Sequence, residues 1–289
     1  MNPEIIDAQI HVWEPNSRDR PWDEAFAQTR ASFIRFGDAI TIERALGAMD
    51  AVGVARAFVT SFHLYHDIDY VLEAARRHPN RFAVVPHIDL DAPAPHELVS
   101  RYAQDPSVVA MRVSFMGKGE EHYTRLHAGA YEPLFEATQR ARLPLMMLVS
   151  SNLKAAGWIA TRHPDLTIIV DHLGMIQGPN RQPPEDRFSG IEDLLALAAI
   201  DNVAVKLTGA PTLSREAYPF RDLWPNLRRI IDAFGARRLM WGSDFSRTRP
   251  LHTYADAVSY MKYSDQVSDT EREALLGGTA GSLVGWHRG

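Results

Sequence analysis

The most constraining feature of this sequence is a regular alternation between short apolar runs and longer amphipathic runs. Eight apolar runs of strand length recur along the chain, and a segment with helical periodicity follows each of them. Alternation of this kind predicts a parallel sheet, because a crossover helix must return the chain between parallel strands. The expected strands cover residues 5–13, 55–62, 82–90, 108–115, 143–149, 166–173, 203–208 and 239–245.

Eight strand–helix units in 289 residues predict a single α/β domain, a distorted (β/α)8 TIM barrel that covers residues 1–289. An open doubly wound sheet is the alternative architecture. No glycine-rich phosphate loop follows any expected strand, which disfavours the nucleotide-binding forms of that alternative. A barrel also predicts where chemistry occurs, since barrel enzymes build their active sites at the carboxyl ends of the strands.

Composition and charge exclude several classes of function. The formal net charge is -5 with both signs interspersed, so no basic patch predicts a nucleic-acid partner. No apolar run reaches the length of a membrane span, and we expect no secretory signal before Ile5. The chain has no cysteine, which excludes disulfides and thiolate metal sites. These features predict a cytoplasmic protein that acts on a small molecule, with assembly into a homo-oligomer left open.

Polar residues gather at the expected carboxyl ends of the strands. In the first strand, the alternation of apolar and polar residues places Asp7, Gln9 and His11 on one face. Asp171 and His172 come at the end of the sixth strand. The other candidates are Arg112, Lys206, Asp244 and Arg247, followed by His63, His66, His87 and Tyr123.

Four motifs, in order along the chain, resemble the amidohydrolase superfamily and, within it, the amidohydrolase-2 branch. They are Asp7-Ala8-Gln9-Ile10-His11-Val12-Trp13, Asp171-His172-Leu173-Gly174, Lys206-Leu207-Thr208-Gly209 and Trp241-Gly242-Ser243-Asp244-Phe245. The resemblance covers nearly the whole chain and implies the same distorted barrel. The branch contains 2-pyrone-4,6-dicarboxylate lactonase, sugar-acid lactonases and metal-dependent decarboxylases of aromatic acids.

The chain departs from the family pattern where members bind a metal. Their metal site usually begins with His-x-His, and Gln9 stands in the place of the first histidine. Metal-binding members often take another histidine from the fifth strand, where this chain has Met146 and its apolar neighbours. The remaining ligands implied by the resemblance are His11, His172 and Asp244, which could hold one divalent ion such as zinc. Because glutamine is not a usual zinc ligand, we expect metal-independent chemistry without a cofactor, and a mononuclear site is the alternative.

The resemblance implies a hydrolase that opens a lactone ring in a substrate carrying a carboxylate. Asp244 is expected to be the general base that takes a proton from water, with burial raising its pKa toward neutrality. His11 and His172 are expected to polarise the lactone carbonyl, and Asp171 is the alternative to His172 as the site residue. Gln9 is expected to orient the water or the carbonyl in place of the missing histidine.

Three cations are expected to bind the anionic part of the substrate. Arg112 would hold a carboxylate through a bidentate pair, together with Lys206 or Arg247. Each cation also has a structural alternative. Arg112 could form an ion pair at the strand end, Lys206 could pair with Asp7 or Asp244, and Arg247 could be a surface charge.

Two other functions stay open at this point. The first is a metal-dependent decarboxylase of an aromatic or muconate-type acid, which requires a Lewis acid. The second is a barrel that binds a small acid without catalysis, since Gln9 and the apolar fifth strand fit a loss of activity. The joint presence of Asp244, His11 and His172 favours the hydrolase. The expected specificity loops cover residues 14–39 and 177–188.

Overall fold

The computed structural model describes residues 4–22, 24, 39–61, 68–115, 119–150, 152–178 and 186–286. Within these ranges, all eight expected strands are present, and every residue in them is buried. The strands are β1 (Ile6–Ile10), β2 (Arg56–Thr60), β3 (Phe82–Val85), β4 (Met111–Ser114), β5 (Leu145–Leu148), β6 (Ile168–Val170), β7 (Val203–Lys206) and β8 (Leu239–Met240).

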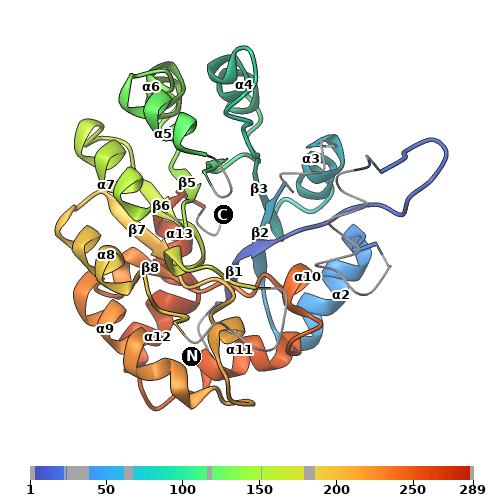
Figure 1. The fold of residues 1–289 in the computed structure, drawn as a ribbon. Coiled ribbons are helices and arrows are strands. Elements are labelled where there is room, and N and C mark those ends of the chain that lie inside the picture. Colours follow the sequence, from blue (N-terminus) through green and yellow to red (C-terminus); the bar gives the residue numbers. More distant parts are fainter. Residues whose placement is uncertain are drawn as a thin grey trace.

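Helices alternate with the strands and surround them on the outside (Figure 1). The α-helices are α2 (Ile42–Val52), α3 (Ile68–Arg77), α4 (Pro95–Tyr102), α5 (Glu120–His127), α6 (Glu132–Arg140), α7 (Leu153–Arg162), α8 (Ile191–Ala196), α9 (Trp224–Phe234), α10 (Phe245–Thr248), α11 (Tyr254–Lys262), α12 (Asp269–Glu273) and α13 (Thr279–Leu283). Short 3-10 turns are η1 (Asp171–Gly174), η2 (Leu197–Ala199), η3 (Ala210–Leu213), η4 (Arg221–Leu223) and η5 (Ala236–Arg238), and η6 (Ala274–Gly278) is a π-helical turn. None of the helices in the described ranges combines the length and the apolar character needed to cross a membrane.

The strands form two parallel groups that are joined at both edges. Strands β1 to β3 pair in order, and so do β4 to β8. At one edge, the backbone N–H of Val109 donates to the carbonyl of Val84 at 3.0 Å. At the other, the N–H of Asp244 donates to the carbonyl of Gln9, also at 3.0 Å. The predicted (β/α)8 barrel architecture is confirmed.

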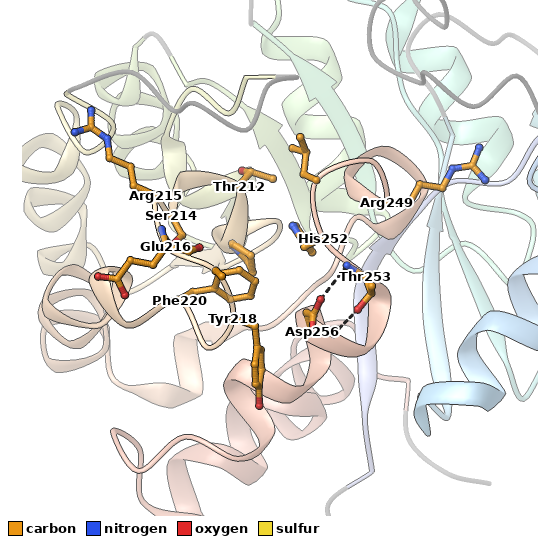
Figure 2. A pocket seen from close by; sticks show the side chains of 13 residues that line it. Thr212, Ser214, Arg215, Glu216, Tyr218, Phe220, Arg249, His252, Thr253 and Asp256 are labelled. Carbon is orange, nitrogen blue, oxygen red and sulfur yellow. Dashed lines mark hydrogen bonds between the residues drawn. The ribbon is translucent and has the colours of Figure 1, made fainter.

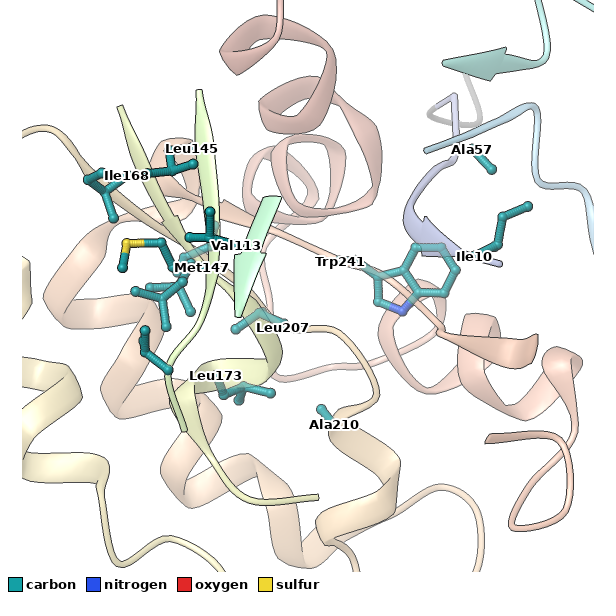
Figure 3. Close-up of a cluster of buried hydrophobic side chains, with 14 of the residues drawn as sticks. Ile10, Ala57, Val113, Leu145, Met147, Ile168, Leu173, Leu207, Ala210 and Trp241 are labelled. Atoms are coloured by element: carbon teal, nitrogen blue, oxygen red, sulfur yellow. The ribbon is translucent and has the colours of Figure 1, made fainter. Parts of the chain in front are cut away.

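Buried apolar side chains fill two layers. Ile6, Met146 and Met240 belong to one cluster although they come from β1, β5 and β8, so this cluster lies inside the barrel. A larger cluster lies between the strands and the helices, and Figure 3 shows Val113 and Leu145 among its members. The two layers together leave the carboxyl ends of the strands as the place where polar side chains can gather.

A β-bulge in β1 decides which side chains reach that place. The register between β1 and β2 shifts between Asp7 and Ile10. Ile6 and Ala8 pack in the inner cluster, whereas Ile10 packs in the outer one. The prediction that Asp7 and Gln9 share a face is therefore wrong, because the extra residue of a bulge reverses the alternation of side chains. Bulges often re-aim side chains beside active sites, as this one does for Gln9.

Strands β6 and β8 end earlier than the predicted ranges 166–173 and 239–245. The chain leaves β6 after Val170 and β8 after Met240. It then turns through left-handed backbone, with φ of 55° at His172 and 52° at Asp244. This region is uncommon for residues other than glycine. The apolar pattern continues past both turns, so it could not reveal them.

Candidate active site

The carboxyl ends of β1, β6 and β8 bring four of the predicted residues together. Nε2 of His11 lies 3.4 Å from Oδ1 of Asp244. Nε2 of His172 lies 3.2 Å from the amide nitrogen Nε2 of Gln9. All four side chains are buried. Motifs that are far apart in the sequence therefore meet at one place in the fold.

His11 is held through both its backbone and its ring. The hydroxyl of Ser246 accepts from the His11 backbone N–H at 2.9 Å and donates to its carbonyl at 2.7 Å. Nδ1 of the ring lies 2.7 Å from the carbonyl oxygen of Thr60. Because a carbonyl oxygen only accepts, Nδ1 carries a proton. The other ring nitrogen is the one that faces Asp244.

Asp244 is an ionised carboxylate in a buried position. Nε of Arg247 donates to Oδ2 of Asp244 at 2.5 Å. Burial alone would raise the pKa of Asp244, but Arg247, followed by His11 and His172, holds that pKa well below its usual range. The expectation that burial raises this pKa is wrong, since the neighbouring positive charge outweighs desolvation. Oδ1 is buried, accepts no well-formed hydrogen bond from the described residues, and has Nε2 of His11 as its neighbour at 3.4 Å.

Arg247 is oriented by Gln177, the first residue of the expected specificity loop 177–188, which the sequence did not single out as a site residue. Its Nη2 donates to Oε1 of Gln177 at 2.7 Å, and Nε2 of Gln177 donates to the carbonyl of Thr208 at 2.8 Å. Gly209 makes room for this contact, because a Cβ there would lie 2.5 Å from Oε1 of Gln177. The Arg247 side chain keeps 14% exposure, unlike the fully buried Asp244. Gly209 of the third motif is the sequence signal that could have indicated this close approach.

Arg112 and Lys206 both form ion pairs with Asp171. Nε of Arg112 donates to Oδ2 of Asp171 at 2.6 Å, and Nζ of Lys206 lies 3.1 Å from Oδ1. The three side chains are each exposed by 3% or less. Burial would raise the pKa of Asp171, but Lys206 and Arg112 hold it well below its usual range. The suggestion that Lys206 pairs with Asp7 or Asp244 is wrong, because its ion-pair partner is Asp171.

Lys206 also connects this ion pair to His172. Its Nζ donates to Oε1 of Gln9 at 3.1 Å, and the amide nitrogen of Gln9 faces the His172 ring. On the other side of the ring, Nδ1 lies 3.4 Å from the carbonyl of Thr208. Burial lowers the pKa of His172 to about 4, in spite of the nearby Asp244, so the ring is neutral at pH 7.

Asp7 of β1 joins this strand to the turn that follows β8. Oδ1 accepts from the backbone N–H of Ser243 at 2.8 Å and of Gln9 at 3.1 Å. Oδ2 accepts from the hydroxyl of Tyr254 at 2.8 Å and from the hydroxyl of Ser243. Complete burial raises the pKa of Asp7 to about 6, although these hydrogen bonds oppose the shift.

Asp7 should therefore give the folding stability a measurable pH dependence. A carboxyl group whose pKa is higher in the folded state stabilises most at low pH, and this contribution is lost as the pH rises through about 6. From about pH 4.5 to about pH 7.5 the loss should be about 2 kcal/mol. Urea unfolding gives the free energies of unfolding of the wild type and of Asp7→Asn at both pH values. The loss is the change, from the lower to the higher pH, in the difference between these two free energies. An unchanged difference would show that Asp7 has an ordinary pKa.

The remaining sequence candidates have other positions. His63 and His66 lie outside the described residues. His87 forms a parallel β-bridge with Arg112 of β4, just after the end of β3. Tyr123 of α5 stacks on Phe115, with 5.9 Å between the ring centroids. Neither contact brings His87 or Tyr123 to Asp244.

A cavity of about 460 Å³ opens between the loops that follow β7 and β8 (Figure 2). Thr212 contributes from η3, and Arg249, His252 and Thr253 contribute from the segment between α10 and α11. The sequence did not predict a cavity here, since its expected specificity loops lie elsewhere. These loops nonetheless stand at the carboxyl ends of the strands, the side of the barrel that holds the candidate site.

The donor atoms in this arrangement do not fit a divalent metal. Among the residues the structure describes, no group of three or more His, Cys, Asp or Glu side chains could hold one. The Arg247 guanidinium binds Oδ2 of Asp244, and the Gln9 amide faces Nε2 of His172. Two of the three ligands implied by the sequence are therefore already engaged by protein groups.

Comparisons with known proteins agree with this fold. A curated L-fucono-1,5-lactonase of Burkholderia ambifaria is 31% identical over 293 residues, which cover 95% of this chain and 93% of that protein. A 4-sulfomuconolactone hydrolase of Hydrogenophaga intermedia is 24% identical and covers 85% of this chain and 75% of its own length. The crystal structure of an amidohydrolase from Burkholderia multivorans with bound zinc matches with a TM-score of 0.75 and 21% identity, over 98% of this chain and 99% of that one. The model of the amidohydrolase family (Amidohydro_2) matches residues 6–286, and the chain belongs to that family.

Proposed function

We propose that this protein hydrolyses the lactone of a small carboxylic acid and does so with protein groups alone. The observation that carries the proposal is the buried Asp244 carboxylate, which stays ionised and places Oδ1 beside Nε2 of His11. The two curated relatives described above are an L-fucono-1,5-lactonase and a 4-sulfomuconolactone hydrolase, which supports the same reaction class.

Asp244 acts as the general base in this proposal. A water molecule bound at Oδ1 gives its proton to the carboxylate while its oxygen attacks the lactone carbonyl carbon. The C–O bond within the ring then breaks, and the ring oxygen receives the proton and leaves as a hydroxyl group. The low pKa of Asp244 makes it a weak base, so catalysis depends strongly on stabilising the oxyanion.

Gln9 and His11 are the donors that can stabilise that oxyanion. The Gln9 amide has two N–H groups, and only one of them faces His172. Nδ1 of His11 already donates to the carbonyl of Thr60, so Nε2 is the ring nitrogen that faces the site beside Asp244. Preorganised donors of this kind are typically worth about 3–4 kcal/mol each.

Arg247 is the cation that binds the substrate carboxylate in this proposal. Arg112 and Lys206 are more deeply buried and share Asp171, whereas Arg247 is partly exposed. Arg247→Met should raise KM for an anionic lactone by about 10–100-fold, because a charged hydrogen bond is worth about 1.5–3 kcal/mol. KM for a neutral lactone should change much less. Steady-state kinetics with both substrates test this, and an equal rise in the two KM values would contradict it.

Removal of divalent metals should leave the activity unchanged. The reason is the engagement of Asp244 by Arg247 and of His172 by Gln9. The measurement is the hydrolysis rate after prolonged chelation, together with the metal content of the same sample. Loss of activity that zinc or manganese restores would show that these contacts rearrange around an ion.

A panel of lactones, followed by a pH indicator, tests the proposed reaction. Sugar-acid lactones, unsaturated lactones bearing a carboxylate and neutral lactones of similar size should be compared. We expect turnover that prefers the anionic members. A protein that binds these acids without turnover, or that releases carbon dioxide from an aromatic acid, would overturn the proposal.

A further inference from the structure

Lys206 is a buried cation for which the proposed reaction has no direct use. Its side chain has no exposed surface, and its neighbours within bonding distance are Asp171 and Gln9. Asp171 thus has two cationic partners, since Arg112 also pairs with it. A second buried cation at one carboxylate is costly to desolvate, so its contact with Gln9 calls for an explanation.

The contact with Lys206 determines which way the Gln9 amide points. An ammonium group only donates hydrogen bonds, so the Gln9 atom that faces it must be the carbonyl oxygen Oε1. The amide NH2 then faces Nε2 of His172 at 3.2 Å. Since an NH2 group only donates, Nε2 of His172 must accept and carries no proton.

The opposite side of the His172 ring leads to the same protonation state. Nδ1 faces the carbonyl oxygen of Thr208, which only accepts, so Nδ1 carries the proton. The hydrogen bond made by one ring nitrogen sets which nitrogen is protonated, and here both bonds require the same form.

We propose that Lys206 is a positioning residue that acts through Gln9 and keeps His172 as the neutral imidazole protonated on Nδ1. Nε2 of His172 then accepts from Gln9 and Nδ1 donates to Thr208, so the ring presents no N–H to a substrate. The donor role expected for His172 from the sequence falls to Gln9, whose amide is held in place by the same contact. This inference deepens the proposed function. Its catalytic consequence rests on the proposed function, whereas the role of Lys206 in setting the protonation state of His172 does not.

Nitrogen NMR of the full chain, with ¹⁵N in its histidine rings, tests the protonation state directly. A His172→Ala spectrum identifies the signals of this ring. In the wild type, Nδ1 should carry the proton and Nε2 should not. Gln9→Glu keeps a partner for Lys206 but presents only acceptor oxygens to the ring, so Nε2 should become protonated.

Lys206→Met is the second variant, and Lys154→Met is its matched control at an exposed position of α7. Lys206→Met leaves Asp171 paired with Arg112 but frees the Gln9 amide to rotate, so Nε2 should become partly protonated. Its kcat should fall by about 10-fold or more, with a smaller change in KM, as for other residues that orient a site histidine. Lys154→Met should change neither the spectrum nor the rates.

A protonated Nε2 in the wild type would overturn the inference. So would His172 signals that stay the same in both Gln9→Glu and Lys206→Met. If Lys206→Met does not fold, Gln9→Glu still decides, because it retains Lys206. If no lactone is hydrolysed, the proposed function fails while the spectra still decide the role of Lys206.

Discussion

Asp244→Asn is expected to lower kcat for lactone hydrolysis by about 10²–10⁴-fold, the usual range for loss of a general base. The amide keeps the size of the carboxylate but cannot take a proton from water. KM should change less, because Arg247, the proposed binder of the substrate carboxylate, is also held by Gln177. The measurement is steady-state kinetics on the best lactone from the panel. Near-normal turnover by this variant would assign the base to another residue.

The pH dependence of the wild type adds a second check on Asp244. Its pKa lies well below the usual carboxyl range, so the ionised form persists as the pH falls from neutrality through the ordinary carboxyl range. Protonation of Asp244 should therefore not reduce the rate between about pH 7 and about pH 5. Asp193→Asn, at an exposed position of α8, is the matched control and should retain full activity.

The barrel could be predicted because its sequence signal is repetitive. Each strand is a buried apolar run, and the long connections between successive strands are largely helical, so local errors at element ends did not change the topology. Helix α5 (Glu120–His127) was not predicted from the sequence, since its segment is strongly charged and buries only Leu126. The meeting of His11, His172 and Asp244 followed from the barrel and from the family motifs, and not from any one strand pattern.

The contacts within the site could not be predicted, because they depend on departures from regular structure. A bulge turns Gln9 toward His172, and left-handed backbone after β6 and β8 places His172 and Asp244. Neither feature leaves a mark in the apolar pattern. Charge pairing has the same limit, since a lysine on β7 can reach several carboxylates. Only the three-dimensional arrangement identifies Asp171 as the partner of Lys206.

Asp171→Asn is expected to give the largest loss of stability, about 3–5 kcal/mol at neutral pH. It removes the one carboxylate that the structure shows between the Arg112 and Lys206 side chains, and leaves both cations buried without a counter-charge. The pKa of Asp171 is lowered in the folded state, so this contribution is complete above the unfolded pKa and is lost only in strong acid. Urea unfolding at pH 7 gives the free energy of each variant.

Glu192→Gln is the control for this experiment, because it removes an ion pair with Arg229 in which both side chains are well exposed. Exposed pairs contribute about 0–1 kcal/mol, so this variant should unfold almost as the wild type does. Lys206→Met should lose less stability than Asp171→Asn, since Arg112 and Asp171 remain paired. If Asp171→Asn were no less stable than Glu192→Gln, the two cations would have to be neutralised by groups other than Asp171. The hydrogen-bond chain from Lys206 through Gln9 to His172 would then lack its anchor.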